Sequence, residues 1–264
     1  LTIGTVGGFY SGISNFDNSS STPTSATIMA DNLNVTSLMQ FDSVNIMPRS
    51  AGVRLNLGGA DAAGTLGISA ADLANISATN LALKADRMDV TAPVTSPSGI
   101  LTIAPLTANR ALNVVAGPKN PANLELLPTE LGNVSASSLV LGDLTTGPVT
   151  VSAPTVIPSS IGNFTLRSGD TATGITVNSA LSASNDLILL GDRMNLNAGV
   201  SSTGGAITIA ANTGGLPIDL GTKTVGTLGD AGAFSFCQSK SFTTGGEGGM
   251  VTTNSEDVMW RAKS

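Results

Sequence analysis

Apolar and polar residues alternate in short stretches along most of the chain. Gly, Pro, Asn and Ser separate these stretches about every 8–12 residues, as turns between strands do. The best helical candidate is Ala70–Ile76, which follows Ser69, a residue type that caps helix N-termini. The pattern therefore predicts an all-β fold of many short strands. Five stretches with apolar residues at i and i+2 are the clearest strands: Leu101–Ile103, Val149–Val151, Phe164–Leu166, Ile175–Val177 and Ile207–Ile209.

Two short motifs recur along the chain at almost the same spacings. Residues 28–36, 83–91 and 189–197 share an apolar start, a central Asp and an alternating end, at offsets of 55 and 106. Residues 81–103 align without gaps to 187–209, with 11 of 23 positions identical. The second motif, at offsets of 57 and 106, is Leu55–Leu57, Leu112–Val114 and Ile218–Leu220. Agreement between two motifs indicates an internal repeat.

This repeat predicts a right-handed parallel β-helix built from coils of about 20 residues. A single coil cannot bury its apolar face alone, so each coil stacks on its neighbours. The offsets correspond to about three and five coils. A β-sandwich or barrel is the alternative, but neither accounts for the long gapless similarity between 81–103 and 187–209.

Composition narrows the function classes. The chain has 264 residues, a net charge of -6, 41% hydrophobic, 11% charged and 3% aromatic residues, and no His. Scarce charge with an ordinary apolar fraction excludes charge-driven disorder. The acidic balance argues against a nucleic-acid partner. Without His, the chain cannot build a His-based triad or a His-ligated metal centre, and we expect no metal site. No apolar run reaches 18 residues, so we expect no membrane-spanning helix.

Composition also changes near residue 229. Residues 1–229 contain five aromatic residues, whereas the much shorter 230–264 contains four, together with the one cysteine, Cys237. We therefore predict two parts: β-helix repeats over 1–229, and a foreign, incomplete strand–loop–helix stub over 230–264. The chain starts without Met and stops within a helix-like sequence, so we expect a fragment at both ends.

The first part resembles the passenger repeats of filamentous-haemagglutinin-like exoproteins. The resemblance rests on Leu55–Gly58 with Ala63–Leu73, and on Ile218–Gly221 with Val225–Gly229. These exoproteins are adhesins exported by two-partner secretion. The resemblance implies a secreted or bacterial cell-surface adhesin fragment with a structural and contact role and no catalysis. It also implies an outer-membrane transporter partner and a host-cell receptor or glycan of unknown identity.

The second part resembles the lysine-loop segment of DegT-family sugar aminotransferases, which use pyridoxal phosphate. From residue 229 it reads Gly-Asp-x-x-x-Phe-Ser-Phe-x-x-x-Lys, followed by Gly-Gly-Glu-Gly-Gly and Val-Thr-Thr-Asn. The resemblance implies that Lys240 occupies the position of the catalytic Schiff-base lysine, and that Ser235 occupies the position that contacts the cofactor phosphate. It also offers an alternative function, a cytoplasmic pyridoxal-phosphate-dependent sugar aminotransferase.

A stretch of about 35 residues is too short to build the family's catalytic domain. We therefore expect Lys240 and Ser235 to be vestigial, with no catalysis in this chain and no cofactor unless the stub belongs to a complete enzyme. Repeat sequence and aminotransferase sequence overlap at residues 225–230, which suggests a chimeric reading frame.

The repeated motif carries a charged pair that needs its own explanation. Arg87 and Arg193 follow Asp86 and Asp192 at aligned positions. We expect a local or stacked salt bridge at a corner of the coil, not a ligand site.

Overall fold

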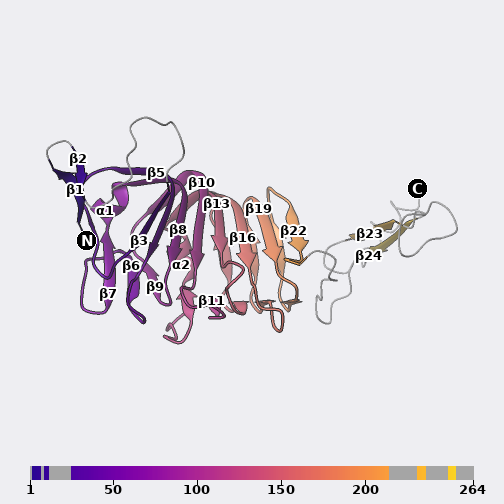
Figure 1. Ribbon diagram of the computed structural model, residues 1–264. Helices are drawn as coiled ribbons and strands as arrows, with labels where there is room; N and C mark the ends of the chain where they lie inside the picture. Colours follow the sequence, from indigo (N-terminus) through magenta and orange to yellow (C-terminus); the bar gives the residue numbers. More distant parts are fainter. Residues whose placement is uncertain (1, 7–8, 12–24, 214–230, 236–248, 254–264) are drawn as a thin grey trace. The chain divides into compact units, whose positions relative to one another are not determined.

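The computed structural model describes residues 2–6, 9–11, 25–213, 231–235 and 249–253 (Figure 1). The chain divides into two compact units, Leu1–Ile218 and Asp219–Ser264. The described residues are mostly β, with two short helices, as the alternating pattern predicted. Neither helix is long and apolar enough to cross a membrane, among the residues that the structure describes.

The largest element of the first unit is an eight-stranded sheet in which every strand pairs parallel with the next (Figure 1). Its strands follow one another in chain order, which means that the chain returns to the same sheet again and again. The strands are β3 (Ser25–Met29), β5 (Met39–Met47), β8 (Ile76–Lys84), β10 (Val94–Ala104), β13 (Val134–Leu141), β16 (Ile161–Arg167), β19 (Asp186–Leu190) and β22 (Ile207–Ala210).

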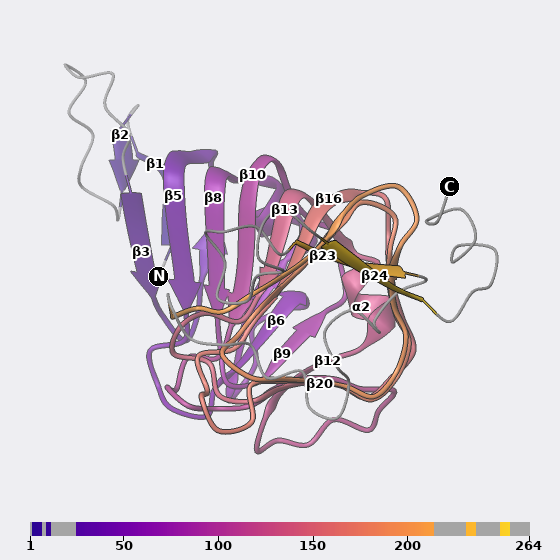
Figure 2. The ribbon, with the colours of Figure 1, turned by 90° about the vertical axis from the view of Figure 1, so that its right-hand side faces the viewer.

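Between these strands the chain passes through smaller parallel sheets. Figure 2 shows β5, β8, β10, β13 and β16 along one wall, with β6, β9, β12 and β20 across from them. One small sheet has the order β7-β6-β9, another β12-β11-β14-β17-β20, and a third β15-β18-β21. Their bounds are β6 (Arg54–Gly58), β7 (Thr65–Ser69), β9 (Met88–Val90), β11 (Leu112–Val114), β12 (Leu124–Leu126), β14 (Val149–Val151), β15 (Thr155–Ile157), β17 (Ile175–Val177), β18 (Leu181–Ala183), β20 (Met194–Leu196) and β21 (Val200–Ser202).

The remaining strands lie near the N-terminus and in the second unit. Strand β1 (Thr2–Val6) pairs antiparallel with β2 (Phe9–Ser11) and parallel with β4 (Asn34–Val35). Every pairing between named strands of residues 25–213 is parallel, unlike the sheets of antiparallel sandwiches and barrels. The second unit contains an antiparallel pair, β23 (Ala231–Ser235) and β24 (Gly249–Thr253).

Apolar rows run across the large sheet and form the core. In one row Leu81, Leu101, Leu139, Phe164 and Leu187 are successive register partners, and each of these side chains is at most 4% exposed. Alternate residues point outward, which accounts for the period of two in the sequence. Full burial of each such side chain contributes about 1.5–3 kcal/mol, so the stacking of neighbouring coils stabilises the unit.

Coil length is less regular than the sequence repeat predicted. Leu81 pairs with Leu101, and Leu187 pairs with Ile207, so these two coils have the same length, which explains the gapless similarity of residues 81–103 and 187–209. The coils that lead into β8 and β13 are almost twice as long, as the pairs Val44↔Leu81 and Leu101↔Leu139 show. The chain inserts a short helix and extra strand into each of these two coils.

The two helices lie in the two longer coils and make equivalent contacts with a neighbouring strand. Helix α1 (Ala70–Ala74) begins after the N-cap Ser69, as predicted, and helix α2 (Pro128–Leu131) was not predicted. In each, an acidic side chain accepts the backbone N–H of a strand residue: Asp72 Oδ1 from Val35 at 2.6 Å, and Glu130 Oε1 from Val90 at 3.0 Å. An amide then donates to the carbonyl of the same strand residue: Asn75 to Val35 and Asn133 to Val90.

No salt bridge joins Asp86 to the adjacent Arg87, and the arginine that approaches Asp86 is Arg110, whose Nε lies 3.8 Å from Asp86 Oδ1. Asp86 instead accepts hydrogen bonds from the backbone N–H (2.8 Å) and the hydroxyl (2.6 Å) of Thr107, one coil further on, while Arg87 donates to the carbonyl of Gly52. Asp192 makes the same two contacts with Thr213. A short carboxylate at a turn satisfies the backbone donors of the next coil more readily than it reaches the adjacent arginine.

Asp143 makes a comparable contact that should affect acid stability. Its carboxylate pairs with Lys84 at 2.7 Å and accepts hydrogen bonds from Thr145. Burial opposes ionisation, but these hydrogen bonds and the Lys84 charge outweigh it and lower the pKa of Asp143 from 3.8 to about 2. A carboxyl whose pKa is lower in the folded state stabilises the fold above its unfolded pKa, and this contribution is lost as the pH falls through the folded pKa.

We therefore expect Asp143→Asn to lower the free energy of unfolding at about pH 6, and the difference from wild type to vanish as the pH falls from about 4 to about 2. Urea unfolding across this pH range measures the difference. The exposed Asp42→Asn serves as the control for the loss of one carboxylate charge from the surface. A pH-independent difference for Asp143→Asn would show that the ionised carboxylate is not the source.

Candidate functional site

The residues predicted from the aminotransferase resemblance lie in the second unit. Ser235 is the last residue of β23 and is the register partner of Gly249, the first residue of β24. Lys240 lies outside the described residues, within the connection 236–248 that joins these two strands. A connection of this length is much longer than the roughly 2–5 residues of an ordinary hairpin, and long connections often carry function.

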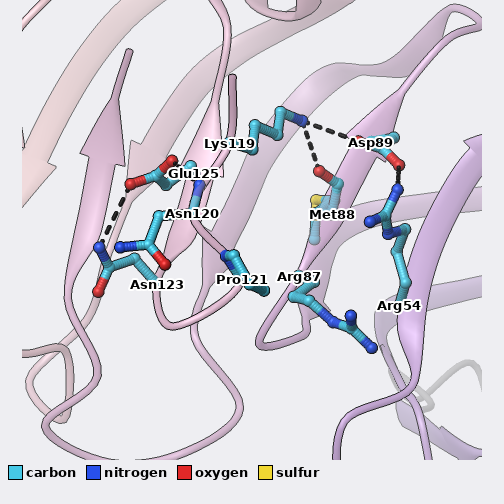
Figure 3. A pocket seen from close by; sticks show the side chains of 9 residues that line it. All are labelled: Arg54, Arg87, Met88, Asp89, Lys119, Asn120, Pro121, Asn123 and Glu125. Carbon is cyan, nitrogen blue, oxygen red and sulfur yellow. Dashed lines mark hydrogen bonds and ion pairs between the residues drawn. The ribbon is translucent and has the colours of Figure 1, made fainter. Parts of the chain in front are cut away.

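The first unit contains a polar pocket of about 270 Å³ that the sequence did not predict (Figure 3). One side of the pocket is formed by β6, β9 and the residue before β9, and the other side by β12 and the residues 119–123 that precede it. Figure 3 shows arginine side chains at one end of the pocket and amide and carboxylate side chains at the other. The lining residues are Arg54, Arg87, Met88, Asp89, Lys119, Asn120, Pro121, Asn123 and Glu125.

Lys119 connects the two sides of this pocket. Its Nζ donates to the carbonyl of Met88 at 2.7 Å, to Asp89 Oδ1 at 2.9 Å and to Glu130 Oε1 at 2.7 Å. Arg54 Nη1 approaches the other oxygen of Asp89 at 2.7 Å. Three ammonium protons thus have three acceptors, and this arrangement fixes the position of the Lys119 side chain.

Asp89 is held ionised between these cations. Burial raises the pKa of Asp89, but hydrogen bonds and Coulomb attraction from Lys119 and Arg54 outweigh this effect and lower the pKa below its ordinary value of 3.8. The group therefore stays charged near neutral pH, where it cannot act as a general acid.

Glu125 at the other end is also fully engaged. Its Oε1 accepts hydrogen bonds from the side-chain amides of Asn113 and Asn123 at 3.1 and 3.2 Å, and its Oε2 accepts the backbone N–H of Asn120. The residue is 5% exposed. These contacts hold the segment 120–125, which forms this side of the pocket, in place. Within the described residues, no group of three or more His, Cys, Asp or Glu side chains is placed to hold a metal ion.

Comparison with known proteins gives one family match. It is the DegT/DnrJ/EryC1/StrS aminotransferase family, at residues 204–264. This family depends on pyridoxal phosphate. The match supports the predicted aminotransferase segment, although it begins at residue 204, upstream of the predicted start at 225, and covers less than a quarter of the chain. No curated protein matches the chain, and no solved structure matches it either.

The prediction of a secreted adhesin is therefore corrected. The family match points to an aminotransferase, and nothing in the comparisons supports adhesin repeats. One of the motifs that suggested adhesin repeats has a structural cause: Leu55 and Leu57 are fully buried in β6, and Gly58, the last residue of β6, has a φ of 108°. The motifs at 218–221 and 225–229 lie outside the described residues. Short motifs of this kind specify stacked strands and turns, and they carry no information about function.

Proposed function

We propose that this chain carries the lysine-bearing segment of a pyridoxal-phosphate-dependent sugar aminotransferase, with Lys240 as the residue that holds the cofactor. The observation that carries the proposal is the family match at residues 204–264, which includes Lys240 and the glycine-rich run 245–249. The spacing between the serine, the lysine and the glycines agrees with the same family.

The residues of the segment fit the chemistry of the cofactor. Pyridoxal phosphate supplies an aldehyde that condenses with an amine and a ring that withdraws electrons. Lys240 would provide the amine and later carry a proton, and the hydroxyl of Ser235 would donate a hydrogen bond to the phosphate. The pairing of Ser235 with Gly249 brings together the two ends of the connection that contains Lys240, which supports a shared site.

For the first unit we propose a right-handed parallel β-helix. Seven parallel steps across the large sheet support it, because crossovers between parallel strands are right-handed in about 98% of cases. The family match overlaps β22, whereas the predicted boundary between residues 229 and 230 lies outside the described residues. We place the change from coils to aminotransferase segment within residues 204–229.

Reductive trapping tests the role of Lys240. The full chain is incubated with pyridoxal phosphate, reduced with borohydride, digested and analysed by mass spectrometry. We expect the phosphopyridoxyl label on the peptide containing Lys240, and loss of that label in Lys240→Arg, because a guanidinium does not condense with the aldehyde. Lys223→Arg, in the same segment, is the matched control and should retain the label on Lys240.

Equal labelling of all lysines would contradict the proposal, since it would reflect only surface amines. Selective labelling of Lys240 that is lowered in Ser235→Ala would further support the phosphate contact.

A further inference from the structure

Cationic side chains are concentrated at the pocket between β6, β9 and the segment 119–123 that precedes β12. The described part of the chain contains eight Lys and Arg residues. Three of them line the pocket, and a fourth, Arg110, supports its wall by donating to the carbonyls of Asp86 and Pro121. Asp89 and Glu130 lie against these cations, and Glu125 lies at the other end of the pocket. Three carboxylates therefore balance the three lining cations, and the excess positive charge is confined to the end that holds Arg54 and Arg87 (Figure 3).

Hydrogen-bond donors outnumber acceptors in the pocket. Arg54 uses Nη1 for Asp89, and Arg87 uses Nη2 for the carbonyl of Gly52; among the described residues their other N–H groups have no partner. The carboxylates of Asp89 and Glu125 are already occupied by protein donors. A ligand that enters the pocket therefore meets unsatisfied guanidinium donors, which favour carboxylate or phosphate oxygens.

The polar end of the pocket adds donors and acceptors for a neutral part of the ligand. Asn120 Oδ1 accepts from the backbone N–H of Ala122, and Asn123 Nδ2 donates to Glu125. The Nδ2 of Asn120 and the Oδ1 of Asn123 have no partner within the described residues, so they can bind hydroxyl groups. A volume of about 270 Å³ holds about nine waters, which is enough for a ligand the size of one sugar ring.

Protein contacts also orient the cationic side chains of the pocket. Lys119 has all three protons engaged, so it positions the wall and Asp89 and does not itself bind the ligand. Arg54 is oriented by Asp89, and Arg87 by the Gly52 carbonyl. Preorganised donors lose little side-chain entropy on binding, which makes affinity for a small ligand attainable.

We propose that this pocket binds a small hydroxylated anion, with Arg54 and Arg87 on its carboxylate or phosphate and Asn120 and Asn123 on its hydroxyl groups. The site belongs to the first unit alone and does not depend on Lys240. Its ligand class follows from the surplus of donors at one end and the mixed amide groups at the other.

Isothermal titration calorimetry on the full chain tests this with three probes that share a sugar ring: glucuronate, glucose 6-phosphate and neutral glucose. We expect at least one of the two anions to bind and glucose to bind at least about tenfold more weakly, because it lacks the charge-assisted contact. A preference between glucuronate and glucose 6-phosphate identifies the anionic group.

Arg87→Gln should weaken binding of the anion about tenfold or more. Arg193→Gln is the matched control, because Arg193 occupies the aligned repeat position, donates to the carbonyl of Ala172, and does not line the pocket. It should bind the anion as the wild type does. Circular dichroism confirms that both variants are folded. Absence of binding by both anions, equal binding of glucose, or equal losses in the two variants would overturn the proposal.

Discussion

Phe164→Ala is expected to lower the free energy of unfolding by about 3–5 kcal/mol. Phe164 is 1% exposed in β16, and its register partners Leu139 and Leu187 lie in the preceding and following coils. Removing the ring leaves a cavity between three stacked strands whose backbone hydrogen bonds prevent collapse around it. Urea unfolding followed by circular dichroism measures the change.

The control for this substitution is Val156→Ala in β15. Val156 is 71% exposed, so its truncation should change the free energy of unfolding by no more than about 0.5 kcal/mol. Phe164→Leu should fall between the two, because the smaller apolar side chain fills part of the space. Equal effects of Phe164→Ala and Val156→Ala would mean that the apolar row is not packed as described.

Many strands of the first unit could be predicted because one face of each is buried. Leu101 and Ile103 point inward in β10, and Phe164 and Leu166 do so in β16, so apolar residues alternate with polar ones in the sequence. The pairing register of these strands could also be predicted in part from the sequence. The gapless repeat aligns 81–103 with 187–209, and in both copies the first strand pairs in parallel with the strand that ends the repeat.

Helix α2 and the pocket could not be predicted, because long-range contacts hold them. Pro128–Leu131 is too short to show a helical period, and Glu130 accepts the N–H of Val90, which lies far earlier in the chain. The ion pairs of the pocket join Arg54, Asp89 and Lys119 across three coils. A proline at the helix start, closely followed by Glu, was the one local signal.

Function was harder to derive than fold for a related reason. Buried leucines and a turn glycine such as Gly58 recur wherever coils stack, so they predict architecture in any functional class. The segment around Lys240 is different, since in the proposed role a cofactor would constrain the spacing of the amine and the glycine-rich run independently of the surrounding fold. This is why the aminotransferase resemblance is supported by the family match and the adhesin prediction is not.

Glu130→Ala is expected to lower the free energy of unfolding by about 3–5 kcal/mol, the range for breaking one side of a buried ion pair. Glu130 is 7% exposed, and its carboxylate accepts from Val90 N–H, Leu127 N–H and Lys119 Nζ. The substitution leaves two backbone donors without acceptors and removes one of the two carboxylates that neutralise Lys119. Urea unfolding at neutral pH measures the loss.

Two variants separate the buried charge from the helix itself. Thr129→Ala changes an exposed residue of α2 and should shift the free energy of unfolding by no more than about 0.5 kcal/mol. Asp72→Ala removes the equivalent cap of α1, which has no ion pair among the described residues, so we expect a smaller cost of about 1–2 kcal/mol. If Asp72→Ala cost as much as Glu130→Ala, backbone capping alone would account for both effects, and the contact between Lys119 and Glu130 would contribute nothing to stability.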